Sequence, residues 1–130
     1  MWLCLNKAFL SIVDKDCGRD ELLVRARVRG HIEAVFPDAV VSHTPGNDYL
    51  FRAAVKRAEV VAAFAEIVMS YRTPNFKNSV KDHDLHDAYS RVWGVMAGLQ
   101  ETPPYSRFRD DYPIARRRAA PKKKQGPLPF

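Results

Sequence analysis

The sequence predicts an α+β fold, a two-layer sandwich in which an antiparallel-rich sheet of four or five strands carries two long helices and one short helix on one face. Three observations lead to this prediction. Short apolar segments alternate with turn residues, later segments repeat apolar residues at helical spacing, and the element order is β-β-α-β-β-α-(β)-α. The preferred version is a ferredoxin-like core from Glu21 onward, although the first helix is short for a crossover between parallel strands.

The first strands are expected at residues 2–5 and 8–13, as one hairpin or as one bulged strand. The clearest strand covers residues 21–29, where two sets of side chains alternate. Alternate residues of a strand point to opposite faces, so one set is expected to face the core. The core set is Leu22, Val24, Ala26 and Val28, and the outward set is Leu23, Arg25, Arg27 and Arg29.

A short helix is expected at residues 30–36, because Pro37 cannot continue it. Strands at residues 39–44 and 49–55 flank a turn of proline, glycine, asparagine and aspartate, which predicts a second hairpin. The residues expected to share one face of its second strand are Tyr49, Phe51, Ala53 and Val55, with Arg52 and Lys56 on the other face.

Two long helices are predicted at residues 57–71 and 81–100, each with an apolar stripe toward the core. The segment between them, residues 76–80, is expected to be a short edge strand or a loop held by the ring of Phe76. The stripes consist of Val60, Val61, Phe64, Ile67, Val68 and Tyr71 in the first helix, and of Leu85, Tyr89, Val92, Met96 and Leu99 in the second.

The charge distribution separates a globular domain, residues 1–101, from a proline-rich basic C-terminal tail, residues 102–130. The net charge of the chain is +6, yet residues 1–100 contribute only +1, from 13 Lys and Arg against 12 Asp and Glu. The last thirty residues contribute the other +5. A cationic tail attracts polyanions, because each neutralised phosphate releases a condensed counterion.

The tail therefore holds the first candidate binding residues, for RNA, DNA or an acidic groove of a protein. Arg107 and Arg109 interleave with Tyr105, Phe108 and Tyr112, an arrangement that stacks on unpaired bases or pins the tail to the domain. A tail that serves only solubility is the alternative. The cationic cluster consists of Arg116, Arg117, Arg118, Lys122, Lys123 and Lys124.

A second cationic surface is expected on the outward face of the sheet, from Arg25, Arg27, Arg29 and Arg52. RNA-recognition modules use open sheets in this way, but they stack bases on aromatic rings. Since no aromatic residue is expected at these outward positions, the match is electrostatic alone. A solvated row of arginines is the alternative.

The sequence indicates no cofactor, no metal and no catalytic residues. His83, His86 and Asp87 share a helix surface and could hold a divalent ion, but aspartates at a helix start also serve as caps. Cys4 is expected in the core and Cys17 at an exposed turn, a usage that fits a reducing compartment. Without a signal peptide or a membrane span, a cytoplasmic protein is expected.

Two stretches resemble segments of a group of small bacterial proteins without an established activity. The first stretch, residues 1–13, begins Met-Trp-Leu-Cys-Leu-Asn and continues Phe-Leu-Ser-Ile-Val. The second, residues 75–93, contains Asn-Phe-Lys-Asn-Ser-Val, then His-Asp-Ala-Tyr and Val-Trp. The resemblance covers residues 1–100, excludes the tail and implies a bacterial cytosolic origin.

These features together predict a non-catalytic module that binds RNA, DNA or a ribonucleoprotein complex. The alternative is a protein–protein interaction factor, an inhibitor or adaptor of a host complex of the kind that mobile elements encode. A small metal-dependent enzyme is a third hypothesis, and it depends only on the two histidines and Asp87.

Overall fold

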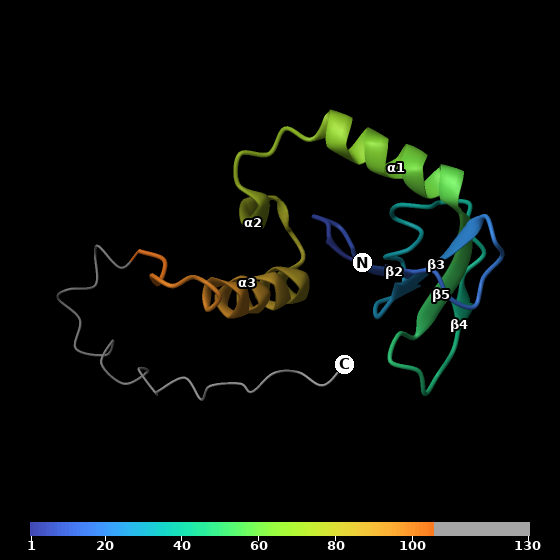
Figure 1. Cartoon of the computed structure of the whole chain (residues 1–130), viewed down its shortest axis with the longest axis horizontal. Coiled ribbons are helices and arrows are strands. Elements are labelled where there is room, and N and C mark those ends of the chain that lie inside the picture. Colours follow the sequence, from blue (N-terminus) through green and yellow to red (C-terminus); the bar gives the residue numbers. More distant parts are fainter. Residues whose placement is uncertain (106–130) are drawn as a thin grey trace, which may run out of the picture. The chain divides into compact units, whose positions relative to one another are not determined.

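A five-stranded antiparallel sheet is the centre of the computed structural model, which describes residues 1–105 (Figure 1). The strand order is β1-β2-β3-β5-β4, and every neighbouring pair is antiparallel. The α+β class and the antiparallel sheet predicted from the sequence are thereby confirmed. The strands are β1 (Trp2–Cys4), β2 (Phe9–Val13), β3 (Glu21–Ala26), β4 (Ser42–His43) and β5 (Phe51–Lys56).

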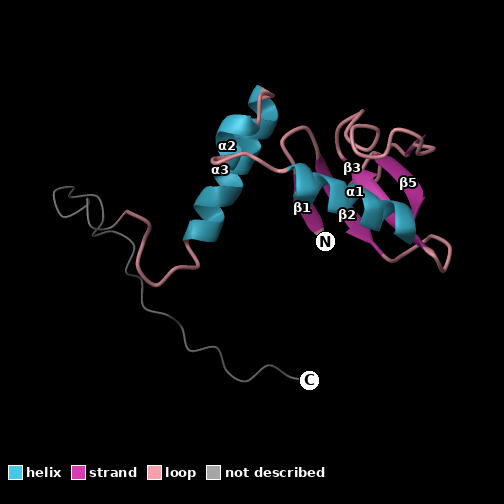
Figure 2. Cartoon of the chain, turned by 90° about the horizontal axis from the view of Figure 1, so that it is seen from above, coloured by secondary structure: helices cyan, strands magenta, loops and turns pink. Residues whose placement is uncertain are grey.

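Three helices complete the described part of the chain: α1 (Arg57–Ser70), α2 (Phe76–Ser79) and α3 (His83–Ala97). Figure 2 shows these helices and the strands in separate colours. The first compact unit ends at Val92, so the boundary between the two units lies inside α3. No helix within residues 1–105 is long and apolar enough to cross a membrane.

The first two strands form a hairpin rather than one bulged strand. The amide of Leu5 donates to the carbonyl of Ala8 at 2.9 Å and closes a tight turn at Asn6 and Lys7. Leu3 then lies opposite Leu10. This pairing places the two leucines on the same face of the sheet, where they join the main core.

The main core lies on one face of the sheet, where β2, β3 and β5 each supply alternate apolar residues. Helix α1 follows β5 directly and adds Val60, which is 3% exposed. The segment of residues 30–36 forms turns instead of the expected helix, but it still buries Ile32 and Phe36 as expected. The fully buried core residues on the strands include Leu10, Ile12, Val24, Ala26, Ala53 and Val55.

A second, smaller cluster surrounds the start of α3, with Val80, Leu85 and Tyr89 buried and Phe9 and Phe76 packed against them. The Tyr89 hydroxyl lies 2.9 Å from the carbonyl oxygen of Leu5 and 2.8 Å from that of Ala8, so it is anchored to the first hairpin. Residues 76–79 are helix α2, not the strand or loop that we expected. The expected role of Phe76 is confirmed, because its ring packs on Tyr89 with centroids 5.6 Å apart.

Several residues expected in the core are exposed. Val28 lies beyond the end of β3 and is 54% exposed, whereas Leu23, expected outside, is buried. Cys4 is also exposed, and Cys17 is half-buried. Only part of each predicted helical stripe is covered; the exposed members are Val61, Val68, Tyr71, Val92, Met96 and Leu99.

Candidate polyanion-binding surface

The four arginines expected on the outward face occupy β3, β5 and the segment after β3. Arg25 lies directly opposite Arg52 in the β3–β5 pair, so these two share the face opposite the main core. Arg27 and Arg29 follow the end of β3, and both are exposed. The expected row of arginines is therefore two strand residues and two residues of the adjoining turn.

Tyr49 is the organising residue of this surface. Its ring is covered by two guanidinium groups: the Cζ of Arg25 lies 4.5 Å from the ring centroid, and the Cζ of Arg27 lies 4.3 Å from it. Arginine is held over an aromatic face by the quadrupole of the ring, so both cations have defined positions. The tyrosine is 3% exposed, so its faces are not free to stack on a base.

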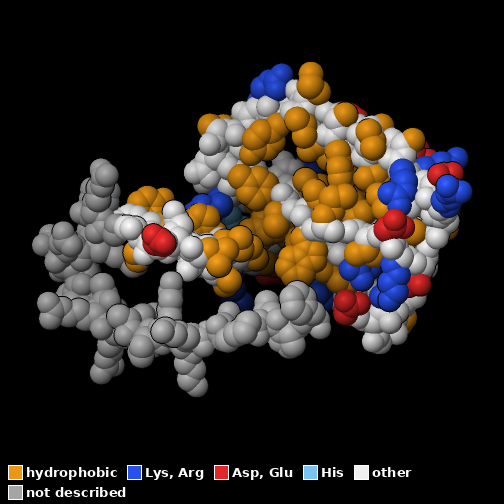
Figure 3. Space-filling model, in the orientation of Figure 1, with side chains coloured by type: hydrophobic (Ala, Val, Ile, Leu, Met, Phe, Trp, Pro, Cys, Tyr) orange, Lys and Arg blue, Asp and Glu red, His pale blue; other side chains and the backbone are white. Residues whose placement is uncertain are grey.

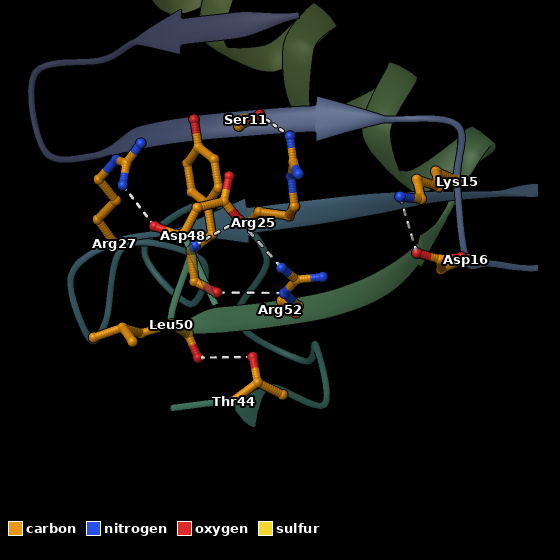
Figure 4. A network of polar contacts seen from close by, with 10 residues as sticks. Ser11, Lys15, Asp16, Arg25, Arg27, Thr44, Asp48, Leu50 and Arg52 are labelled. Atoms are coloured by element: carbon orange, nitrogen blue, oxygen red, sulfur yellow. Dashed lines mark hydrogen bonds and ion pairs between the residues drawn. The ribbon is translucent and has the colours of Figure 1, made fainter. Parts of the chain in front are cut away.

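Hydrogen bonds fix the guanidinium groups further, as Figure 4 shows. Arg25 donates through Nη2 to the Ser11 hydroxyl at 2.8 Å. Arg27 donates to the main-chain carbonyl of Asp48. Arg52 donates to the carbonyl of Tyr49 at 3.3 Å and forms an ion pair of 3.4 Å with the Asp48 carboxylate. We call these four arginines, Tyr49 and Asp48 the arginine–tyrosine cluster.

The electrostatic balance of the arginine–tyrosine cluster is strongly positive. Four guanidinium groups and the single carboxylate of Asp48 leave a net charge of +3. Each guanidinium carries five N–H donors, and the bonds above use only a few of them. The Nε of Arg25 is buried without a hydrogen-bond partner and is closed to a ligand, whereas Arg27 and Arg29 are exposed. The cluster therefore presents unused donors that suit phosphate or carboxylate oxygens.

Arg29 contacts a different aromatic pair, which includes the ring of Phe51 from the main core and so does not belong to the face of Arg25 and Arg52. Its Cζ lies 5.1 Å from the ring centroid of Phe51, and that ring stacks on His43 with centroids 5.1 Å apart. Sequence reasoning missed both aromatic contacts, and it placed Tyr49 on the core face of a strand that in fact begins at Phe51. The sequence shows a tyrosine directly after a turn and, elsewhere, two arginines spaced two residues apart, but no sequence signal pairs them.

An open pocket of about 370 Å³ adjoins Arg27. Its walls are mainly apolar, with His31 at one side and two aspartates, Asp82 and Asp84, at the start of α3. The Nδ1 of His31 accepts a hydrogen bond of 3.2 Å from the amide of Phe9, so the ring keeps a fixed orientation. The apolar lining residues are Phe9, Val28, Leu85, Ala88, Tyr89 and Val92.

The candidate binding residues of the tail lie outside the described residues. These are Arg107, Arg109, Arg116, Arg117, Arg118, Lys122, Lys123 and Lys124. The last described residue, Tyr105, stacks on Trp93 of α3 with centroids 6.4 Å apart. Both rings belong to the second unit, so the hypothesis that the tail is pinned to the globular domain stays a prediction.

The histidine and aspartate residues at the start of α3 have structural contacts of their own. Asp82 caps the helix through its Oδ1, which accepts a 2.8 Å hydrogen bond from the amide of Leu85. His86 lies 3.7 Å from the Asp87 carboxylate. Within residues 1–105 no group of three or more histidine, cysteine, aspartate or glutamate side chains could hold a metal ion.

One titratable group of the second cluster is strongly perturbed. Burial raises the pKa of the Tyr89 hydroxyl well above its usual range, and the thiol of Cys4 adds to the rise. Desolvation also raises the pKa of that thiol. The Tyr89 hydroxyl and the Cys4 thiol therefore stay protonated at neutral pH, and neither is activated as a nucleophile or a base.

Comparison of the chain with protein-family models, with curated proteins and with solved structures gave no match.

Proposed function

We propose that the protein is a non-catalytic module that binds nucleic acid, with the arginine–tyrosine cluster as the contact surface of its first unit. The observation that carries the proposal is the local excess of positive charge at Tyr49 and Asp48, where the guanidinium groups of three arginines, Arg25, Arg27 and Arg52, meet a single carboxylate. Positioned arginines bind phosphate oxygens through two parallel N–H bonds, and they lose little conformational freedom when they do so.

The two exposed members of the cluster, Arg27 and Arg29, are the residues that would reach the phosphates. Arg27 uses one N–H on Asp48, and Arg29 donates no hydrogen bond to any residue in the described part of the chain. Arg25 and Arg52 are half-buried and are held by Ser11 and Asp48, so their role is to set the local potential.

The pocket beside Arg27 favours single strands over duplexes. Unpaired bases can leave the stack and enter an apolar pocket, while a duplex keeps them inside. The walls of Phe9, Leu85 and Tyr89 would cover the base, and Asp82 and Asp84 would accept hydrogen bonds from its amino groups. RNA and single-stranded DNA both meet these requirements.

The basic tail would act as a second contact for the same nucleic acid, or for a ribonucleoprotein complex. Its six clustered cations supply affinity that depends on salt and not on sequence. An acidic groove on a protein would offer similar chemistry. The cytoplasm is the compartment in which we expect the protein to act.

The proposal can be tested by fluorescence anisotropy with labelled single-stranded RNA, single-stranded DNA and a duplex of matched length. The full chain is compared with a variant that lacks residues 115–130. We expect the single strands to bind more tightly than the duplex, and the deletion to weaken binding sharply. Equal, salt-independent binding of both proteins would contradict the proposal.

We also propose that the sheet is a rearranged ferredoxin-like core. Strands β3, β5 and β4 have the neighbours and directions of the first, third and second strands of that fold. The remaining edge, which the last strand would occupy, is held by β2 from the N-terminal hairpin. Residues 76–79, where a last strand was expected, are helical.

A protein–protein interaction factor is the second candidate function, and one observation favours it. The second half of α3 and the residues after it expose large apolar side chains, with Val95 75% exposed and Leu99 76% exposed. Exposed apolar patches of this kind mark interaction sites. Capture of one stoichiometric protein partner after nuclease treatment, with no affinity for oligonucleotides, would favour this function over nucleic-acid binding.

A further inference from the structure

Trp2 is an exposed aromatic residue on the face of the sheet that carries Arg25 and Arg52. It pairs with Ser11 of β2, and Ser11 pairs with Arg25 of β3. Arg25 pairs in turn with Arg52 of β5. Residues that lie directly opposite each other on neighbouring strands point to the same face. The four side chains therefore form one row across the sheet, on the face opposite the main core.

The ring of Trp2 is open to solvent, and its backbone is held in place. The residue is 73% exposed. The ring of Phe9 meets it in a T-shaped contact, with centroids 6.0 Å apart and an interplanar angle of 67°. One such contact cannot cover both faces of an indole, so a flat partner can still stack on it. The amide of Ile12 donates to the carbonyl of Met1 at 2.8 Å and fixes this end of β1 to β2.

Trp2 supplies an open aromatic ring, which Tyr49 does not. The ring of Tyr49 is covered by two guanidinium groups, and the residue is 3% exposed. Phe9, which contacts Trp2, is also a wall of the pocket beside Arg27. Figure 3, in the orientation of Figure 1, shows hydrophobic side chains around the N-terminal end of the chain and Lys and Arg side chains beside them. An open ring thus lies close to positioned cations.

We propose that Trp2 stacks on one unpaired base of a single-stranded nucleic acid whose phosphates lie along the arginines. This inference rests on the proposed function and assigns it a further binding residue. Proteins that bind single strands combine such stacking with cations that follow the backbone. A duplex keeps the faces of its bases stacked on one another. An apolar protein surface would have to desolvate the neighbouring arginines without compensation.

The spacing along the row suits a short stretch of one strand. Neighbouring strands of a sheet are about 4.8 Å apart, so the backbones of Trp2 and Arg25 are separated by about 10 Å. Successive nucleotides of a stacked strand are about 3.4 Å apart. Three or four nucleotides therefore reach from the indole to the arginines, and one base can stack while neighbouring phosphates meet the guanidinium groups.

Fluorescence anisotropy with the full chain and a labelled strand of about ten deoxythymidines tests the contribution of Trp2. Trp2→Ala should weaken binding at least about fivefold and at most about 150-fold, the range found for one stacked base. Trp2→Phe keeps a flat ring and should retain most of the affinity. The matched control is Tyr71→Ala, at a ring 49% exposed at the end of α1, which should bind like the parent.

A strand of the same length without bases separates stacking from a structural role of Trp2. The parent and Trp2→Ala should bind this abasic strand equally, because the phosphate contacts remain and no base can stack. An affinity of Trp2→Ala for the deoxythymidine strand equal to that of the parent overturns the proposal. An equal loss of affinity for both strands overturns it too, because the effect of Trp2 would then not depend on bases.

The emission of Trp2 gives a second measurement that leaves this residue unchanged. The chain has two tryptophans, so Trp93→Phe makes Trp2 the only one. A base stacked on indole quenches its emission, and we expect quenching by the deoxythymidine strand but not by the abasic strand. A parent chain that binds neither strand contradicts the proposed function itself. Binding of the deoxythymidine strand without quenching contradicts only the stacking on Trp2.

Discussion

The salt dependence of nucleic-acid binding offers the most direct test of the arginine–tyrosine cluster. Each phosphate neutralised on a single strand contributes a slope of about −0.7 to log K against log [salt]. The double substitution Arg27→Gln with Arg29→Gln removes the two exposed guanidinium groups of the cluster and keeps polar side chains of similar length. If both arginines contact phosphates, the slope should become shallower by about 1.4.

This change in slope corresponds to a measurable difference in affinity. Between about 50 and 200 mM salt, the parent should lose about sevenfold more affinity than the variant does, from a slope difference of 1.4. The assay is anisotropy with a labelled single-stranded oligonucleotide at several salt concentrations. The fold should survive, because both side chains are exposed and Arg25 and Arg52, which are half-buried, are retained.

The matched control is Arg19→Gln with Arg91→Gln, which removes the same charge from two exposed arginines outside the cluster. Its slope should stay close to that of the parent, because these residues contribute only to the long-range field. Equal slopes for the parent and the Arg27/Arg29 variant would refute the assignment of the cluster as a phosphate-binding surface. Equal changes in the two double variants would show that net charge alone drives binding.

Three further predictions concern the tail, the second cluster and the core. Deletion of residues 115–130 should make the same salt slope shallower by about 4, if all six clustered cations contact single-strand phosphates at about 0.7 each. The folded state holds the Tyr89 proton through its raised pKa, so stability should fall as pH rises above the unfolded value of about 10, by about 1.4 kcal/mol per pH unit. In urea unfolding at pH 9 and 11, Tyr89→Phe should reduce this dependence to the part that the raised pKa of Cys4 contributes, and Tyr71→Phe, at a half-exposed tyrosine, should retain all of it. Leu10→Ala, at a fully buried leucine, should cost about 2–5 kcal/mol of unfolding free energy, whereas Val40→Ala should change it by less than about 0.5 kcal/mol.

The sequence predicted the sheet well because its signals there are local. Alternation in residues 21–26 and the turn at residues 45–48 each specify their own segment, and both predictions agree with β3 and with the second hairpin. The shared outward face of Arg25 and Arg52 followed from the same alternation, whereas their direct pairing was not predicted. The end of this strand was predicted wrongly, because β3 stops at Ala26 instead of residue 29. Val28 was therefore predicted in the core, but it is exposed.

For the helices, the spacing of apolar residues did not predict which side chains are buried. An apolar residue at helical spacing indicates that a face can be buried, but it does not say what covers that face. In α1 both Val60 and Val61 fit the pattern, and of the two only Val60 is covered by residues 1–105. The tyrosine of the candidate site was missed for a related reason, since a contact between a turn residue and two arginines some twenty residues away depends on tertiary structure.

The near-neutral charge of residues 1–100 conceals two surfaces of opposite character. The arginine–tyrosine cluster carries an excess of positive charge, and the exposed side of α1 around Val61, Val68 and Met69 carries no charge. An apolar partner would have to desolvate the arginines of the first without compensation, and a polyanion would gain nothing from the second. The two surfaces therefore require different partners.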